Sequence, residues 1–177
     1  MKRVIVLLFV FGSLIVQAQK YTSEKSKVIF FSDAAIEDIR AENTKSTSEF
    51  NVGSGEIKFT IKIIQFEFEK DLMKEHFNEK YMETERYREA TFKGNVLDFK
   101  LDKAGEQPVK VKGKLTIHGQ TQDVEIPGTM EVKDGKILAQ SKFIVKLKDY
   151  KIKIPQLLWQ NIAEDVEVSV DFTYKPE

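Results

Sequence analysis

The chain has 177 residues, with 28 Lys and Arg against 28 Asp and Glu, so its formal net charge is zero. A balanced charge argues against a protein that binds nucleic acid by neutralising phosphates, and no nucleic-acid partner is expected. The absence of Cys excludes disulfides and Cys-ligated zinc, and two His argue against a multi-histidine site, so we expect neither metal nor cofactor.

Residues 1–18 have the features of a secretory signal peptide. Lys2 and Arg3 form a positive start, an apolar run follows, and Val16 and Ala18 stand at the positions that signal peptidase reads. The run is shorter than the roughly 20 residues that span a bilayer, which argues against a membrane anchor. We therefore expect cleavage near Ala18, a single domain over residues 19–177 without a transmembrane anchor, and a periplasmic or secreted protein.

The first clear strand begins at Ile57. Its apolar residues alternate with polar ones, which is typical of an antiparallel strand with one buried face. In Ile57–Phe68 the apolar parity changes after Ile63, and in Ala90–Leu101 it changes after Val96. Each change requires a β-bulge or a sharp bend, and both devices belong to strongly curved sheets.

Two segments are not strand-like. Lys70–Lys80 carries Leu72, Met73 and Phe77 on one helical face, which predicts a short helix. Pro155–Ala163 begins with Pro and contains an apolar patch, which predicts a turn or a single helical segment before the last strand.

Three later segments alternate with a period of two: Val109–Ile117, Ile137–Leu147 and Val166–Tyr174. Short turn signals such as Asp134-Gly135 separate the strands, as in a meander of antiparallel hairpins. About eight curved strands close most economically into a barrel, which also removes the exposed edges. The predicted fold is therefore all-β, an antiparallel barrel of about eight strands with one or two short helices.

The chain contains 13 Phe, and most of them fall at apolar parity. Such residues fit a solid core and equally well the wall of an apolar cavity, because eight-stranded barrels occur both filled and hollow. Strand parity predicts wall residues, and the non-strand segments predict residues of a rim or lid. The wall candidates are Ile57, Phe59, Ile61, Phe92, Leu115, Phe143 and Val145, and the rim candidates are Leu72, Met73, Phe77 and Trp159.

The remaining polar features favour structural interpretations. His76 is expected to hold the short helix against a loop, and His118, at a strand end, to hydrogen-bond turn backbone. Eight lysines form the strongest charge bias and are interpreted as a solvated outer face, with attraction to anionic headgroups as the alternative. These are Lys110, Lys112, Lys114, Lys142, Lys146, Lys148, Lys151 and Lys153.

Three stretches resemble motifs of the YceI-like family. Leu72–Phe77 and Tyr87–Gly94 resemble its apolar, His-containing helix followed by Tyr-Pro-x-x-Thr-Phe, with Arg88 in place of the usual Pro. Val111–Thr121 resembles a Val-x-Gly-x-Leu-Thr-Ile-x-Gly-x-Thr strand and turn. Phe143–Pro155 resembles the family's penultimate strand, and the similarity runs from about Lys27 to Phe172.

The resemblance implies a lipocalin-like, elongated barrel. It also implies an exported bacterial protein without enzymatic activity, and some members of the family bind a long polyisoprenoid inside the barrel. We therefore expect a carrier or sequestering protein for a long-chain lipid, an isoprenoid first, with a quinone or a fatty acid as alternatives. The rival is a ligand-free filled barrel acting as a stress-related or protein-interaction module, and a hydrolase using His76 or His118 is a third class. The sequence leaves the loading partner and the oligomeric state open, a homodimer included.

Overall fold

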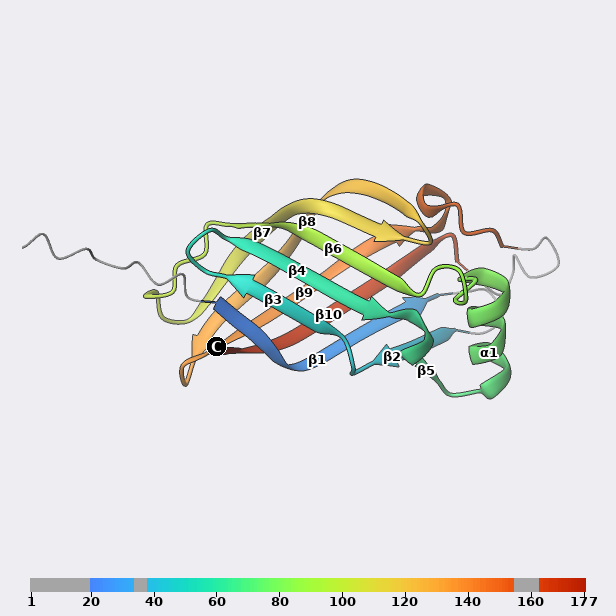
Figure 1. Ribbon diagram of the computed structural model, residues 1–177, viewed down its shortest axis with the longest axis horizontal. Helices are drawn as coiled ribbons and strands as arrows, with labels where there is room; N and C mark the ends of the chain where they lie inside the picture. The colour runs from blue at the N-terminus through green and yellow to red at the C-terminus, as the bar shows by residue number, and fades with distance from the viewer. Residues whose placement is uncertain (1–19, 34–37, 155–162) are drawn as a thin grey trace, which may run out of the picture.

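The computed structural model describes residues 20–33, 38–154 and 163–177, which form an elongated antiparallel barrel (Figure 1). Eight strands make its wall, and β10 pairs with β1 to close it. This confirms the predicted all-β fold with a barrel of eight strands. They are β1 (Lys20–Ser32), β3 (Thr47–Asn51), β4 (Glu56–Lys62), β6 (Glu89–Leu97), β7 (Glu106–Ile117), β8 (Gln120–Lys133), β9 (Lys136–Lys146) and β10 (Asp165–Pro176).

Two more strands, β2 (Ile39–Asn43) and β5 (Glu67–Phe68), form a side ribbon on β1. The start of β1 pairs with β3, whereas its second half pairs with β2. Asn43 fixes the corner between β2 and β3 and is fully buried. Its amide donates to the Lys62 carbonyl at 2.9 Å, and its side-chain oxygen accepts from the Lys45 N–H at 2.9 Å.

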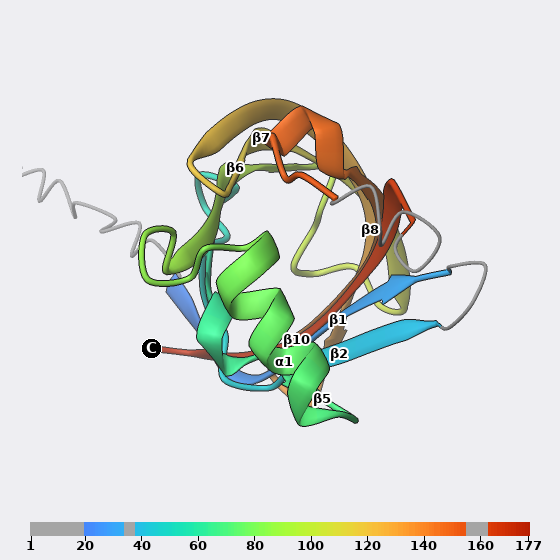
Figure 2. The same ribbon diagram turned by 90° about the vertical axis from the view of Figure 1, so that its right-hand side faces the viewer.

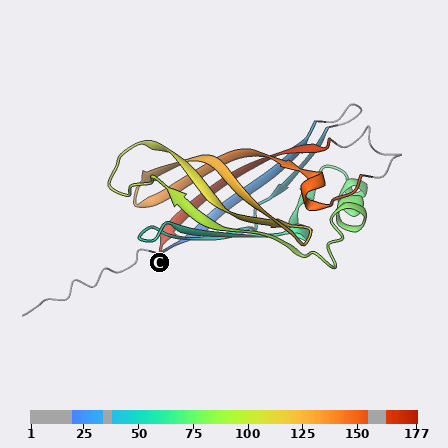
Figure 3. The same cartoon turned by 90° about the horizontal axis from the view of Figure 1, so that it is seen from above.

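The helical elements lie at one end of the barrel, which we call the helix end. There α1 (Asp71–His76) continues into the π-helical turn η2 (Phe77–Tyr81) and lies across the barrel (Figure 2). This confirms the helix predicted in Lys70–Lys80. Two 3-10 turns, η1 (Ile63–Gln65) and η3 (Leu147–Tyr150), lie at the same end (Figure 3).

Within the described ranges, no helix has the length and apolar character needed to cross a membrane. The expected signal peptide at 1–18 lies outside the described residues, as does the segment predicted at Pro155–Ala163 except for its last residue.

A sharp turn at the end of β4 and another at the end of β6 account for the two predicted changes of apolar parity. β4 ends at Lys62, and η1 then leaves Ile63 buried but Ile64 exposed. β6 ends at Leu97, where Asp98 takes a left-handed conformation with φ of 67°. The irregular register of the barrel lies instead in β1, between Ser23 and Lys25.

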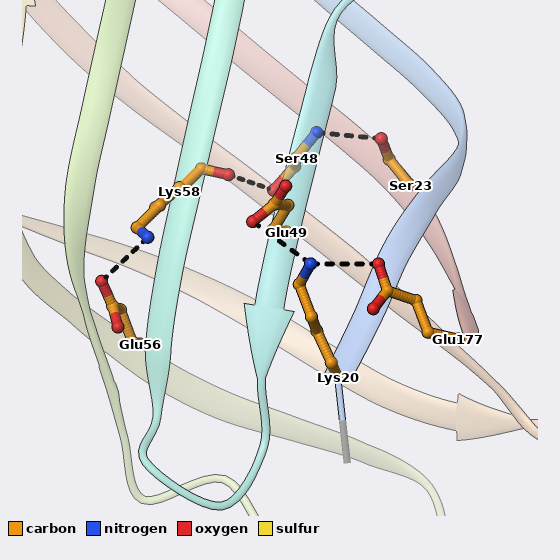
Figure 4. A network of polar contacts seen from close by, with 7 residues as sticks. All are labelled: Lys20, Ser23, Ser48, Glu49, Glu56, Lys58 and Glu177. Atoms are coloured by element: carbon orange, nitrogen blue, oxygen red, sulfur yellow. Dashed lines mark hydrogen bonds and ion pairs between the residues drawn. The ribbon is translucent and has the colours of Figure 1, made fainter. Parts of the chain in front are cut away.

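Polar contacts tie the irregular part of β1 to its neighbours (Figure 4). Ser23 Oγ accepts from the Ser48 N–H of β3 at 2.9 Å, while Ser48 Oγ donates to the Lys58 carbonyl of β4 at 2.7 Å. Lys20 Nζ lies 3.1 Å from a carboxylate oxygen of Glu177, so the C-terminus is joined to the start of β1.

Packed side chains fill the barrel at the opposite end, which we call the closed end. Ile137, Phe172 and Tyr174 are completely buried there, and Phe50 is 1% exposed. The loop at 98–105 folds over this end because Gln107, also buried, receives the Lys100 N–H at 3.1 Å and donates to the Lys100 carbonyl at 2.8 Å. The largest fully buried apolar side chains therefore lie at the closed end.

Candidate functional site

A cavity of about 590 Å³ occupies the half of the barrel next to α1. Its floor consists of Ile57, Val109 and Met130, which belong to the buried core. Ligand pockets of proteins have volumes of about 300–1,000 Å³ and are mostly lined by apolar side chains. The barrel is thus filled at one end and hollow at the other. Its phenylalanines contribute both to the packed half and to the wall of the cavity.

Aromatic rings separate the hollow half from the filled half. The Phe59 ring lies 4.9 Å from the Phe172 ring of the closed end, in an edge-to-face arrangement, and 6.1 Å from the Phe92 ring. Phe59 and Phe92 both line the cavity, whereas Phe172 lies beneath them. Edge-to-face pairs of this kind add stability beyond their buried area, so the cavity has a firm aromatic base.

A pair of glycines makes room for the Phe92 ring. Gly94 of β6 and Gly113 of β7 lie opposite each other. A Cβ atom on either glycine would lie 2.7 Å from Cζ of Phe92 and 2.4 Å from a backbone carbonyl oxygen. The two glycines therefore let Phe92 lean along its strand toward the closed end, away from the middle of the cavity.

Four phenylalanine rings hold α1 at the helix end. The Phe77 ring stacks on Phe30 of β1 at 5.1 Å and lies 5.8 Å from Phe66 and 5.0 Å from Phe68. This cluster joins the helix to the β1–β2–β5 side of the barrel. Leu72, which is 60% exposed, and Met73 line the cavity from the same helix.

Polar side chains of the described cavity lining occur at two places. Ser32, Lys70, His76 and Tyr81 lie at the helix end, and Thr129, Gln140 and Ser141 lie where β8 meets β9. The wall between these places is formed by aliphatic and aromatic side chains. Such a cavity suits an apolar chain whose polar group stays at an opening.

His118 has a structural environment outside the cavity lining. Its Nδ1 lies 3.2 Å from the Tyr150 carbonyl oxygen, and its Nε2 lies 3.4 Å from a carboxylate oxygen of Glu83. The Tyr87 ring packs 4.3 Å from the imidazole. His118 therefore joins η3 to the segment after η2, and its contact with the Tyr150 carbonyl fits the predicted hydrogen bond to turn backbone. In the part of the chain that the structure describes, no three His, Asp or Glu residues are grouped to hold a metal ion.

Several lysines on the outer face of the strands form ion pairs with carboxylates of neighbouring strands. Lys110 and Lys112 lie 2.9 and 3.0 Å from the carboxylate of Glu125, and their hydrogen bonds hold the pKa of that carboxyl below its usual value. Lys142 lies 2.7 Å from Glu167 in the same way. These pairs fit the interpretation of a solvated outer face.

The structure brings ten of the eleven predicted site residues together around the cavity. Trp159 lies outside the described residues. That these side chains contact a lipid stays a prediction. The ten are Ile57, Phe59, Ile61, Leu72, Met73, Phe77, Phe92, Leu115, Phe143 and Val145.

Sequence reasoning missed the contribution of the first and last strands, β1 and β10, to the cavity wall. Val28 and Phe30 of β1 and Val166, Val168 and Val170 of β10 also line the cavity. The alternation of β10 was a usable signal for its three valines. No comparable alternation marks β1, because its register shifts at Ser23.

Closed antiparallel barrels with an apolar internal cavity form a class of proteins suited to enclosing apolar ligands, and this chain has that architecture. The model of the YceI-like domain matches residues 20–174, and the chain belongs to this family. The match extends slightly beyond the stretch in which the sequence shows the resemblance. A comparison with curated proteins found no match.

Solved structures share the fold at low sequence identity. A polyisoprenoid binding domain from Saccharophagus degradans is 17% identical, with a TM-score of 0.77 over 89% of this chain and 98% of its own. BcnA of Burkholderia cenocepacia is 20% identical, with a TM-score of 0.71 over 84% of this chain and 95% of its own. The YceI protein of Campylobacter jejuni is 19% identical, with a TM-score of 0.52 over 100% of this chain and 99% of its own.

Proposed function

We propose that this protein is an exported carrier or sequestering protein that buries the chain of a long apolar lipid, an isoprenoid, in the barrel cavity. The carrying observation is the cavity of about 590 Å³ with its aliphatic and aromatic wall. Burying roughly 400 Å² of a lipid chain contributes about 10 kcal/mol at ~25 cal/mol per Å², before the cost of association. Affinity of this origin requires no charged partner and no catalytic group.

Two further observations support the proposal. The Saccharophagus degradans structure is described as polyisoprenoid binding, and it shares this fold. The leader-like residues 1–18 support a location in the periplasm or outside the cell. A quinone or a fatty acid has the same chemistry of a long apolar chain and a small polar group, so both are outcomes that the test distinguishes.

The test is solvent extraction of the protein purified from its native envelope, followed by mass spectrometry of the extract. We expect one long-chain prenyl lipid in about equal amount to the protein, and an N-terminus at Gln19. A quinone or a fatty acid in that amount would replace the isoprenoid and keep the carrier. Trace, heterogeneous lipid from a folded, monodisperse sample would contradict the proposal and favour an interaction module without ligand.

A further inference from the structure

The barrel wall splits between β8 and β9 on the side of the helix end. The ladder between these strands runs from Lys133 paired with Lys136 to Gly128 paired with Ser141, and it ends there. Beyond that point β8 stays paired with β7, and β9 stays paired with β10. Figure 1 shows β8 arching over the barrel, apart from β9 at this end.

Pro127 explains why the ladder ends. The backbone N and O of a strand residue point to the same neighbouring strand. The Pro127 carbonyl accepts from Ser141 Oγ at 2.6 Å, so its nitrogen also faces β9. Proline has no N–H to donate, and the Ser141 hydroxyl takes the carbonyl in place of a backbone donor. The next backbone pair is therefore lost.

A second hydrogen bond bounds the split at the helix end. Gln122 Nε2, near the start of β8, donates to the Asp149 carbonyl of η3 at 2.8 Å. Between this bond and the Gly128–Ser141 pair, β8 and β9 are unpaired. We call this bounded opening in the wall the window.

The cavity reaches the window. In an unbroken sheet only alternate residues face the interior. Next to the window, where the ladder is still paired, three consecutive residues of each strand line the cavity, Gly128–Met130 of β8 and Ala139–Ser141 of β9. An outer groove across β8, β9, β10 and β1 shares Thr129, Gln140 and Ser141 with the cavity lining. The cavity and the outer groove therefore meet at the edge of the window, where the β8–β9 ladder ends at Gly128 and Ser141.

The two sides of the window differ in chemistry. Ile126 of β8 and Phe143 and Val145 of β9 present apolar side chains to the cavity. The outer groove adds polar and charged residues, Lys27, Gln140, Lys142, Ser169 and Asp171 among them, to the apolar side chains of Ile29, Pro127 and Val170. An apolar chain fits the inner side, and a polar headgroup fits the outer side.

We infer that the lipid chain enters the cavity sideways through the window between β8 and β9, leaving its headgroup in the outer groove. This inference rests on the proposed function. The closed end is filled by buried side chains. The helix α1 lies across the helix end (Figure 2), and the ring contacts of Phe77 with Phe30, Phe66 and Phe68 hold it there. Lateral passage requires neither end to open.

Engineered cysteines test the window directly, because the chain has none of its own. Glu125→Cys and Ile144→Cys place two thiols on the outer side of β8 and β9, across the window. The control pair, Lys58→Cys and Lys93→Cys, lies on residues that are paired across the closed β4–β6 ladder. Each pair is joined by oxidation, or by a short bismaleimide where a disulfide does not form.

The readout is the rate at which each protein takes up cis-parinaric acid, a fatty acid whose fluorescence rises in apolar surroundings. We expect the cross-link over the window to slow uptake at least tenfold, with the bound amount after long incubation unchanged. For a disulfide, reduction should restore the rate. The control cross-link should leave the rate unchanged.

The outcomes separate this inference from the proposed function. Equal uptake rates with and without the cross-link over the window would overturn lateral passage, while leaving the carrier in place. Equal slowing by both cross-links would also overturn it, because the effect would then come from stiffening the barrel. Failure of the unmodified protein to bind either cis-parinaric acid or a long-chain prenol would overturn the carrier itself.

Discussion

Tyr174 is a single side chain on which the closed end depends. It is completely buried, and its hydroxyl lies 2.7 Å from Ser48 Oγ. Because the Ser48 hydrogen goes to the Lys58 carbonyl, Tyr174 is the donor in this pair. Burial raises the pKa of the Tyr174 phenol far above its usual value near 10. Above pH 10 the unfolded chain loses this proton while the folded chain keeps it, so the free energy of unfolding falls.

Tyr174→Phe should therefore change both the stability and its pH dependence. At neutral pH we expect the free energy of unfolding to fall by about 1 kcal/mol, the typical value of one hydrogen bond. Between pH 10 and 11.5 the decline with pH should be shallower than in the wild type, by up to about 1.4 kcal/mol per pH unit. Urea denaturation across this range measures both effects.

Ser48→Ala is the matched control, because it removes the same hydrogen bond and keeps the phenol. It should lose stability at neutral pH and retain the wild-type alkaline decline. Equal alkaline declines in the wild type and in Tyr174→Phe would show that Tyr174 ionises as easily in the folded chain as in the unfolded one.

At the scale of elements, α1 is a short helix whose position depends on tertiary contacts. A six-residue helix has little stability of its own in water. Phe77 anchors it through ring contacts with Phe30, Phe66 and Phe68. We expect Phe77→Ala to raise amide hydrogen exchange over residues 71–81 at least tenfold, while β7 and β10 stay protected.

Leu72→Ala is the control on the same helix, since Leu72 is 60% exposed. It should leave the exchange of 71–81 nearly unchanged. If Phe77→Ala raised exchange equally throughout the barrel, the cluster would be part of the global core rather than a local anchor of α1.

The strands that alternate cleanly could be predicted from the sequence, and those of the N-terminal third could not. β4, β7 and β10 each keep one apolar face, because each keeps its barrel neighbours along most of its length. β9 keeps its face through its continuous pairing with β10. β1 exchanges its partner from β3 to β2 and shifts register at Ser23, so its apolar residues do not follow one parity. Periodicity describes one strand at a time and cannot show a change of neighbour.

The window escaped prediction for the same reason. Pro127 is visible in the sequence, but the strand that it fails to pair with is set by the closed topology. The site residues were easier to predict, since strand parity alone separates the inner face of the barrel from the outer one. Parity could not decide whether the barrel is hollow, because Phe172 and Phe143 share the inward face of paired strands yet one is packed and the other lines the cavity.

At the scale of the whole molecule, the barrel separates stability from binding. The packed residues of the closed end and the cavity wall belong to the same strands but to opposite halves of the barrel. A polar substitution deep in the wall should therefore abolish binding without unfolding the chain, provided that it avoids the packed half. Phe143 meets this condition better than Phe59, whose ring contacts Phe172 of the closed end.

Phe143→Arg should abolish lipid retention. A guanidinium in the cavity has no charged partner, so it must keep its hydrating water there, and that water excludes the lipid chain. Extraction and mass spectrometry of the purified variant should yield less than a tenth of the wild-type lipid, with the circular dichroism spectrum unchanged. Ile64→Arg places the same charge on a side chain that is 54% exposed, and it should retain the wild-type amount. Wild-type lipid in a folded Phe143→Arg protein would remove Phe143 from the binding wall and move the ligand away from β9, and with it the case for the window beside that strand.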